Sequence, residues 1–124
     1  MWRILAIDDD LEILQLVREI LNVPDYELRT VSSGTEALNL VESWHPDLVI
    51  SDVMMPGKGG LATVLELRQK YPELRVIIMT GQVPEEAHVL DEIASSFGSG
   101  TVLYKPLAIV EIRDAVRKAL KGAP

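Results

Sequence analysis

The stretch LVISDVMMPG at residues 48–57 decides the fold, because it joins a buried strand to a polar turn. Its first residues, Leu48–Ile50, form a continuous apolar run, which is typical of a strand covered on both faces. Asp52 follows, and Pro56-Gly57 then favours a turn. The stretch therefore predicts a strand of a parallel sheet that carries one carboxylate to the edge where the strand ends.

Further apolar runs of strand length occur on both sides of this stretch, with helical patterns between them. They are Ile4–Ile7, Glu27–Val31, Val76–Met79 and Val102–Leu103, of which Glu27–Val31 is the weakest. This alternation predicts an α/β fold, in which helices pack on both faces of a parallel sheet. The length of 124 residues suits one domain, and we expect residues 1–124 to form it without an internal linker.

The predicted helices lie between these strands. They are expected to follow Asp10, to begin at Ser33, to run from about Gly60 to Tyr71, to lie near Glu85–Ser95 and to start just after Pro106. Asp10 is interpreted as the cap of the first helix, and Ser33 with Glu36 forms a capping box at the second. The side chains expected to face the core are Ile13, Leu16, Val17, Ile20, Leu21, Ala37, Leu38, Val41, Leu61, Val64, Leu65, Ile109, Ile112, Val116 and Leu120.

The composition argues against several classes of protein. A formal net charge of −7 disfavours direct nucleic-acid binding, because a protein that contacts phosphates needs a basic face. The chain has no cysteine, which excludes disulfides and thiolate metal sites and suits a reducing cytoplasm. No apolar stretch reaches the roughly 18 residues that a transmembrane helix needs. We therefore expect a soluble cytoplasmic protein without direct contact to nucleic acid or membrane.

Polar side chains stand where the predicted strands end, which is the edge at which open α/β sheets bind ligands. They are Asp8 and Asp9, Asp52, Thr80 and Lys105. Carboxylates brought close together repel one another, and an all-oxygen cluster without His or Cys favours Mg²⁺. A lysine ammonium and a threonine hydroxyl beside that ion suit a phosphoryl group. The set therefore fits a site in which an aspartate becomes an acyl phosphate.

These motifs resemble those of the receiver domains of two-component response regulators, over essentially the whole chain. The matching residues are Asp8-Asp9, Asp52 to Gly57 with Gly60, Thr80-Gly81, Phe97-Gly98 and Lys105-Pro106. The resemblance implies a flavodoxin-like (βα)5 three-layer sandwich with the parallel strands in the order 2-1-3-4-5. It also implies a cis Lys105–Pro106 bond.

The resemblance implies roles for the residues of the site. Asp52 would accept a phosphoryl group from a sensor histidine kinase or a phosphotransfer protein in a Mg²⁺-dependent reaction. Asp9, Asp52 and the Met54 backbone carbonyl would bind Mg²⁺, and Asp8 would act through a coordinated water. Lys105 and Thr80 would hold phosphoryl oxygens.

The resemblance also implies how the signal leaves the domain. The fourth helix, fifth strand and last helix would switch an output domain or partner protein, and a homodimer could form through the same surface. The domain would take part in its own phosphorylation and slow autodephosphorylation without being an enzyme for another substrate. The end of the chain at residues 121–124 fits a stand-alone receiver or, slightly better, one that is followed by an output domain.

One position departs from the family pattern. Family members often carry an aromatic residue three positions before the lysine, where this chain has Val102. Tyr104 lies two residues on, and because strand side chains alternate, it should share the face of Val102. Our hypothesis is that Tyr104 replaces the missing switch aromatic.

The sequence is compatible with two other functions. A haloacid-dehalogenase-like phosphatase would use Asp8-x-Asp10, Thr80 and Lys105 in the same order, although the later acidic pair and the cap domain are missing and Asp52 would have no role. A receiver that docks partners without being phosphorylated is the third possibility, which Val102 keeps open.

Overall fold

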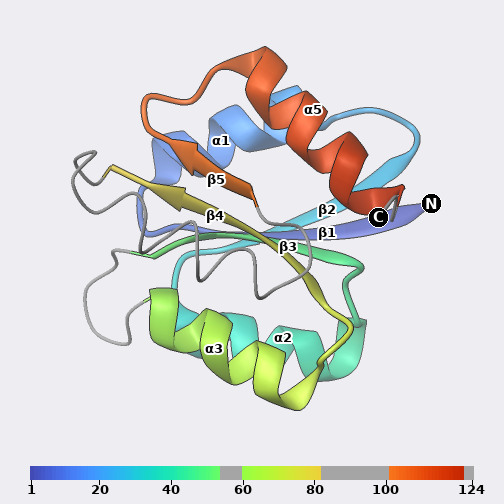
Figure 1. Cartoon of the computed structure of the whole chain (residues 1–124), viewed down its shortest axis with the longest axis vertical. Helices are drawn as coiled ribbons and strands as arrows, with labels where there is room; N and C mark the ends of the chain where they lie inside the picture. Colours follow the sequence, from blue (N-terminus) through green and yellow to red (C-terminus); the bar gives the residue numbers. More distant parts are fainter. Residues whose placement is uncertain (54–59, 82–100, 122–124) are drawn as a thin grey trace.

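The computed structural model describes residues 1–53, 60–81 and 101–121, which form a parallel sheet between two layers of helices (Figure 1). The strands are β1 (Trp2–Ile7), β2 (Tyr26–Val31), β3 (Leu48–Asp52), β4 (Arg75–Thr80) and β5 (Thr101–Tyr104). Their order is β2-β1-β3-β4-β5, and every neighbouring pair is parallel. The predicted flavodoxin-like fold class and strand order are therefore confirmed, and β3 lies in the centre of the sheet.

The helices cover both faces of this sheet. They are α1 (Leu11–Ile20), α2 (Gly34–Trp44), α3 (Gly60–Lys70) and α5 (Ile109–Leu120). Figure 1 shows α1 and α5 on one face and α2 and α3 on the other. The helix predicted near Glu85–Ser95 and the Phe97-Gly98 motif lie outside the described residues. No helix in the described ranges has the length and apolar character to cross a membrane.

The central strand packs against helices through alternate side chains. Leu48 and Ile50 belong to the apolar cluster under α1 and α5, whereas Val49 belongs to the cluster under α2 and α3. All three side chains are buried. Because both faces of β3 are covered, its first three residues, Leu48–Ile50, form a continuous apolar run, as the opening stretch predicts. The packing fixes the position of the end of the strand, where Asp52 lies.

Side chains cap the first two helices as predicted. The Asp10 carboxylate accepts a hydrogen bond from the Glu12 amide at 2.9 Å. The Ser33 hydroxyl accepts from the Glu36 amide at 3.2 Å and donates to the Glu36 carboxylate at 3.2 Å. The caps satisfy amides that have no partner within the helix. Asp10 thus has a structural role at the start of α1.

Two side chains predicted to face the core are exposed. Leu65 on α3 is 48% exposed, and Ile109 at the start of α5 is 49% exposed. Leu65 follows Val64, which is buried, and the next position along an α-helix is turned by about 100°. Ile109 is the first residue of α5, since the helix begins there rather than directly after Pro106. Conversely, the prediction omitted Leu14, which is buried in α1.

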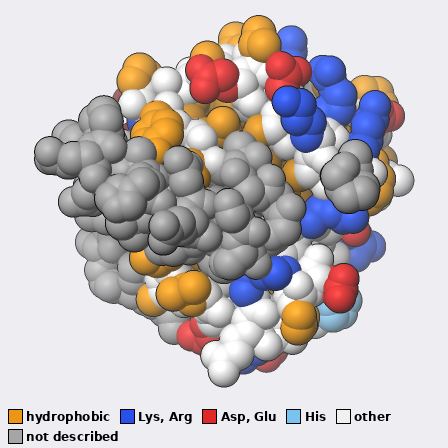
Figure 2. Space-filling model, viewed as in Figure 1, with side chains coloured by type: hydrophobic (Ala, Val, Ile, Leu, Met, Phe, Trp, Pro, Cys, Tyr) orange, Lys and Arg blue, Asp and Glu red, His pale blue; other side chains and the backbone are white. Residues whose placement is uncertain are grey.

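Positive charge is concentrated on α5 despite the net charge of −7. Figure 2 shows Lys and Arg side chains gathered over this helix and toward its C-terminal end. The exposed residues concerned are Arg113, Arg117, Lys118 and Lys121. Cations near a helix C-terminus interact favourably with the helix dipole, which gives Arg117 and Lys118 in the last turn a structural role.

Candidate functional site

The carboxyl ends of four strands bring the predicted site residues to one edge of the sheet. Asp8 directly follows β1, Asp52 ends β3, Thr80 ends β4, and Lys105 directly follows β5. Asp8, Asp52 and Thr80 are buried, although each carries a polar side chain. Burying polar groups is costly unless they have partners, so a buried polar cluster at this edge is a candidate functional site.

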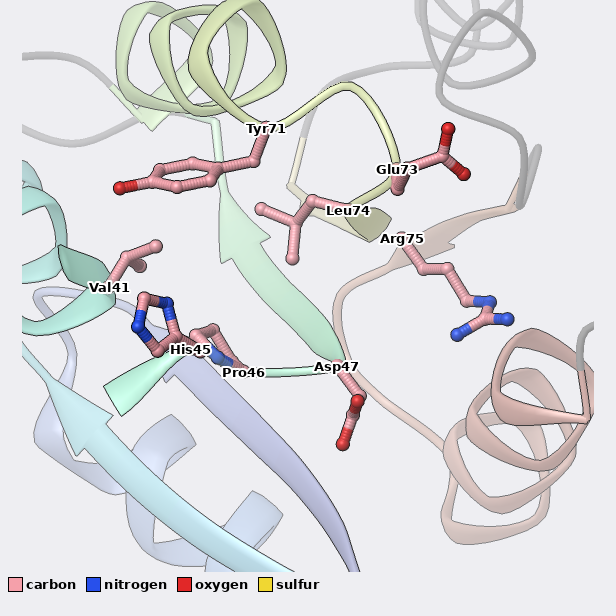
Figure 3. A pocket seen from close by; sticks show the side chains of 8 residues that line it. All are labelled: Val41, His45, Pro46, Asp47, Tyr71, Glu73, Leu74 and Arg75. Atoms are coloured by element: carbon pink, nitrogen blue, oxygen red, sulfur yellow. The ribbon is translucent and has the colours of Figure 1, made fainter. Parts of the chain in front are cut away.

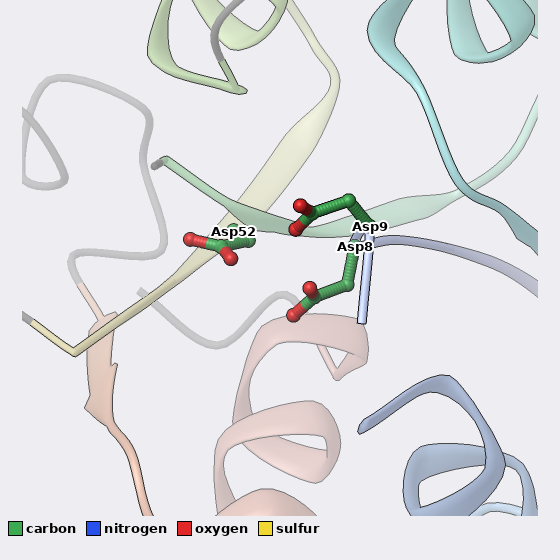
Figure 4. A group of neighbouring side chains, drawn as sticks. All are labelled: Asp8, Asp9 and Asp52. Carbon is green, nitrogen blue, oxygen red and sulfur yellow. The ribbon is translucent and has the colours of Figure 1, made fainter. Parts of the chain in front are cut away.

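Three carboxylates meet at this edge. Asp8, Asp9 and Asp52 each offer an oxygen such that these atoms lie within 4.8 Å of one another. Figure 4 shows Asp8 and Asp9 extending from the end of β1 toward the side where Asp52 lies. Asp8 and Asp52 are buried, whereas Asp9 is exposed to solvent. A cluster of hard oxygen atoms with one open side fits Mg²⁺, which keeps several waters when it binds to proteins.

Lys105 bridges the two buried carboxylates. Its ammonium nitrogen donates to Asp8 Oδ2 at 2.8 Å and to Asp52 Oδ2 at 2.9 Å. The other oxygen of Asp8 accepts from the Asp10 amide at 2.9 Å. These distances confirm that Asp8, Asp9, Asp52 and Lys105 converge, as their positions at strand ends predict.

Burial and ion pairing shift the pKa values of two of these groups. Burial raises the pKa of Asp8, and the neighbouring charge of Asp52 adds to the rise, against hydrogen bonds from Lys105 and the Asp10 amide that lower it. Burial alone would lower the pKa of Lys105, but its hydrogen bonds to Asp8 and Asp52, together with the charges of these two carboxylates, outweigh burial and raise it. The lysine is therefore a permanent cation at neutral pH, held between two acids.

Thr80 lies beside this group through the pairing of the strands. Asp52 pairs with Met79 on β4, and Thr80 is the next residue. The Thr80 carbonyl accepts from the Lys105 amide at 2.8 Å, which ties the end of β4 to the residue that carries the ammonium. The Lys105–Pro106 bond is cis, as the resemblance implies.

Gly60 explains how α3 approaches the site. A Cβ atom at this position would overlap the Asp52 carbonyl oxygen and lie 2.9 Å from the Val53 Cα. Only glycine permits so close a contact between the first turn of α3 and the end of β3. Gly60 at the start of α3 therefore packs directly against the backbone of Asp52.

The described residues do not test two of the predicted features. Met54, whose carbonyl is predicted to bind Mg²⁺, lies outside the described residues. Tyr104 ends β5 and is 36% exposed, whereas Val102 is half-buried and packs against the cluster under α2 and α3. The replacement of the switch aromatic by Tyr104 stays a prediction.

A separate pocket of about 340 Å³ lies at the opposite edge of the sheet (Figure 3). The α2–β3 and α3–β4 connections form it. Its lining residues are Val41, His45, Pro46, Asp47, Tyr71, Glu73, Leu74 and Arg75. None of them belongs to the carboxylate cluster, because they lie where β3 and β4 begin rather than where they end. The candidate functional site is therefore the carboxylate cluster at the ends of the strands and not this pocket.

Comparisons with known proteins agree with the geometry. A family model described as the response regulator receiver domain matches residues 4–117. Sporulation initiation phosphotransferase F of Bacillus subtilis is 36% identical over 118 residues, which cover 95% of this chain and 93% of that protein. Response regulator MprA of Mycolicibacterium vanbaalenii is 34% identical over 121 residues, covering 96% of this chain but 50% of that protein. The chain thus spans about half the length of its MprA relatives.

A solved structure resembles the chain over nearly its full length. The response regulator protein TrrA from Thermotoga maritima, in complex with Mg²⁺-BeF, superposes with a TM-score of 0.80 at 32% identity. The match covers 97% of this chain and 100% of that chain.

Proposed function

Because the chain belongs to the family of response regulator receiver domains, we propose that Asp52 accepts a phosphoryl group in a Mg²⁺-dependent reaction. The observation that carries this proposal is the ammonium of Lys105, which lies 2.9 Å from Asp52 and 2.8 Å from Asp8. A carboxylate oxygen of Asp9 lies within 4.8 Å of carboxylate oxygens of Asp8 and Asp52. A nucleophile, a fixed cation and an oxygen cluster for a metal therefore stand together.

Asp52 is the nucleophile in this proposal. One of its carboxylate oxygens forms a bond to phosphorus while the bond between phosphorus and the donor's histidine nitrogen breaks, and that electron pair stays on the imidazole. With acetyl phosphate as donor, the broken bond is the one from phosphorus to the acetate oxygen. The hydrogen bond from Lys105 positions the Asp52 carboxylate at the end of a rigid strand.

Lys105 and Thr80 hold the phosphoryl oxygens, since an ammonium and a hydroxyl both donate hydrogen bonds to anionic oxygen. Asp9, Asp52 and the Met54 carbonyl are the proposed Mg²⁺ ligands, with Asp8 acting through a water. Bound Mg²⁺ supplies positive charge that offsets the repulsion between the carboxylates and the incoming phosphoryl group. The relative TrrA, whose structure is a complex with Mg²⁺-BeF, supports Mg²⁺ as the proposed cofactor.

The proposed partners are proteins. A sensor histidine kinase or phosphotransfer protein in the cytoplasm would supply the phosphoryl group to residues 1–124, acting as one receiver domain. An output domain or partner protein, or a second copy of the chain, would respond at the surface of the fourth helix, β5 and α5. In this proposal the domain turns over no separate substrate and contacts neither nucleic acid nor membrane.

Exposed aliphatic side chains next to the site support a protein as the phosphoryl donor. Leu11 is 69% exposed and Val110 is 67% exposed, and Ile109 is exposed as well. Leu11 begins α1 shortly after Asp8, while Ile109 and Val110 begin α5 shortly after Lys105. Apolar side chains exposed on the helices that follow Asp8 and Lys105 favour docking of a partner surface. We propose that the kinase or phosphotransfer protein contacts them.

Intact mass spectrometry after incubation with acetyl phosphate and Mg²⁺ tests the proposal. The proteins are the wild type, Asp52→Asn and Asp10→Asn. We expect the wild type and Asp10→Asn to gain one phosphoryl group when Mg²⁺ is present, and Asp52→Asn to gain none. Loss of the adduct in Asp10→Asn alone would favour the phosphatase-like function. No adduct on the wild type, while a known receiver is labelled, would favour the docking module.

A further inference from the structure

Ser51 is a buried polar residue in the otherwise apolar part of β3. Its side chain is fully buried, directly before Asp52 in the chain. Its hydroxyl donates a hydrogen bond to the backbone carbonyl oxygen of Asp52 at 3.0 Å. The chemistry proposed above gives Ser51 no role.

The Asp52 carbonyl occupies a particular place in the sheet. The pairing of β1 with β3 ends at Ile7 and Ser51, whereas the pairing of β3 with β4 continues to Asp52 and Met79. The Val53 amide donates to the Met79 carbonyl at 3.2 Å, toward β4. Because the N–H and C=O of one trans peptide point in opposite directions, the Asp52 carbonyl points toward the β1 side. The Ser51 hydroxyl thus supplies a donor just past the last paired residue of β1.

The first turn of α3 covers the same peptide. Gly60 packs so closely that a Cβ atom would overlap the Asp52 carbonyl oxygen. The Leu61 amide donates to the next carbonyl, that of Val53, at 3.4 Å. Removing a hydrogen-bond donor from a buried carbonyl lowers the free energy of unfolding. The hydrogen bond from Ser51 therefore contributes more here than it would at the surface. Ser51, Met79 and α3 together hold the Asp52–Val53 peptide in one orientation.

We propose that Ser51 is a positioning residue for phosphoryl acceptance. By fixing the Asp52–Val53 peptide, its hydroxyl fixes the direction in which the Asp52 carboxylate leaves the strand toward Lys105. The contact between Lys105 and Asp52 is 2.9 Å long, and a rotation of the peptide would change its length and direction. The inference rests on the proposed function, because it assumes that Asp52 is the phosphoacceptor.

The test compares two substitutions of Ser51 with a control. Ser51→Ala removes the hydroxyl, and Ser51→Cys keeps a similar volume while replacing it with a weak donor. Thr63→Val is the control, because Thr63 is a fully buried residue with a hydroxyl on α3 and has no proposed role in the site. The rate of phosphoryl incorporation from acetyl phosphate is measured against Mg²⁺ concentration, alongside urea unfolding.

We expect both Ser51 variants to lower the limiting rate about three- to tenfold, which corresponds to the net contribution of one hydrogen bond. Thr63→Val should lose stability without this loss of rate. A slow Ser51→Ala beside a normal Ser51→Cys would overturn the proposal, because volume and not hydrogen bonding would then matter. Wild-type rates in both Ser51 variants, or an equally slow Thr63→Val, would also overturn it and leave the proposed function intact. A wild type that takes no label would overturn both.

Discussion

At Asp8, a buried carboxylate lies within the reach of a second carboxylate and one ammonium group. Burial, followed by the charge of Asp52, raises its pKa above the ordinary value of 3.8, and the hydrogen bonds from Lys105 and the Asp10 amide do not fully compensate. Because the folded protein disfavours the ionised form of Asp8, this carboxylate lowers the free energy of unfolding at neutral pH. Such a cost is common where function requires charges to be held together.

The substitution Asp8→Asn tests this cost. We expect the metal-free variant to have a free energy of unfolding about 1 kcal/mol higher than the wild type at neutral pH. The folded pKa of Asp8 is raised, so the stability that its protonated form gives is present at low pH and is lost as the pH rises through that pKa. The difference between the proteins should therefore shrink as the pH falls from neutral toward the ordinary carboxyl pKa of 3.8.

Urea unfolding over this pH range provides the measurement. Asp9→Asn serves as the control, because Asp9 is exposed and its removal relieves no burial. A metal-free Asp8→Asn that is less stable than the wild type at neutral pH would show that the pairing with Lys105 outweighs the cost of burial.

Among the described elements, α3 packs directly on the end of β3 through Gly60. Gly60→Ala places a methyl group against the Asp52 backbone, so we expect a loss of about 1–3 kcal/mol of stability together with slower labelling of Asp52. Gly81→Ala is the matched control, since a Cβ there would meet no described atom within 4 Å. Chemical unfolding of both variants checks the prediction, and equal losses would contradict it.

The starts of α1 and α5 carry the proposed docking surface for the phosphoryl donor. Leu11→Glu places a charge on this surface, so we expect at least tenfold slower transfer from a histidine kinase, roughly the effect of losing one buried aliphatic contact. Labelling by acetyl phosphate should be unchanged. Leu65→Glu is the control, because Leu65 is an exposed leucine on α3, on the other face of the sheet.

The two donors make this prediction decisive. The kinase is the one that labels the wild type most rapidly among those available. A Leu11→Glu variant slowed equally with both donors would indicate damage to the site, and one slowed with neither would remove Leu11 from the docking surface.

The sequence predicts most of the sheet and the convergence of the site, because both follow from where apolar runs end. Asp8, Asp52 and Lys105 meet since parallel strands place their carboxyl ends at one edge. The side of α3 that faces the core is harder to predict, because Val64 and Leu65 are adjacent and both apolar. The sequence does not predict the proposed role of Ser51, because that role depends on the direction of one peptide beyond the β1–β3 pairing.

For the whole molecule, we expect the proposed Mg²⁺ binding by the acidic cluster to raise stability. A ligand that binds only the folded protein raises the free energy of unfolding, by about 1.4 kcal/mol at ten times its dissociation constant. We expect Mg²⁺ to produce such a rise in the wild type and a much smaller one in Asp9→Asn. Thermal unfolding in Mg²⁺ and in Na⁺ at equal ionic strength measures the difference. An equal rise in both proteins would place the bound metal elsewhere.

Locating the phosphoryl group on the chain tests directly whether Asp52 is the phosphoacceptor. The labelled protein is reduced with borohydride, which converts an aspartyl phosphate to homoserine, and its peptides are sequenced by mass spectrometry. We expect homoserine at position 52 alone, and only when both Mg²⁺ and acetyl phosphate have been present. Homoserine at position 8, 9 or 10 instead would contradict the assignment of Asp52 as the phosphoacceptor.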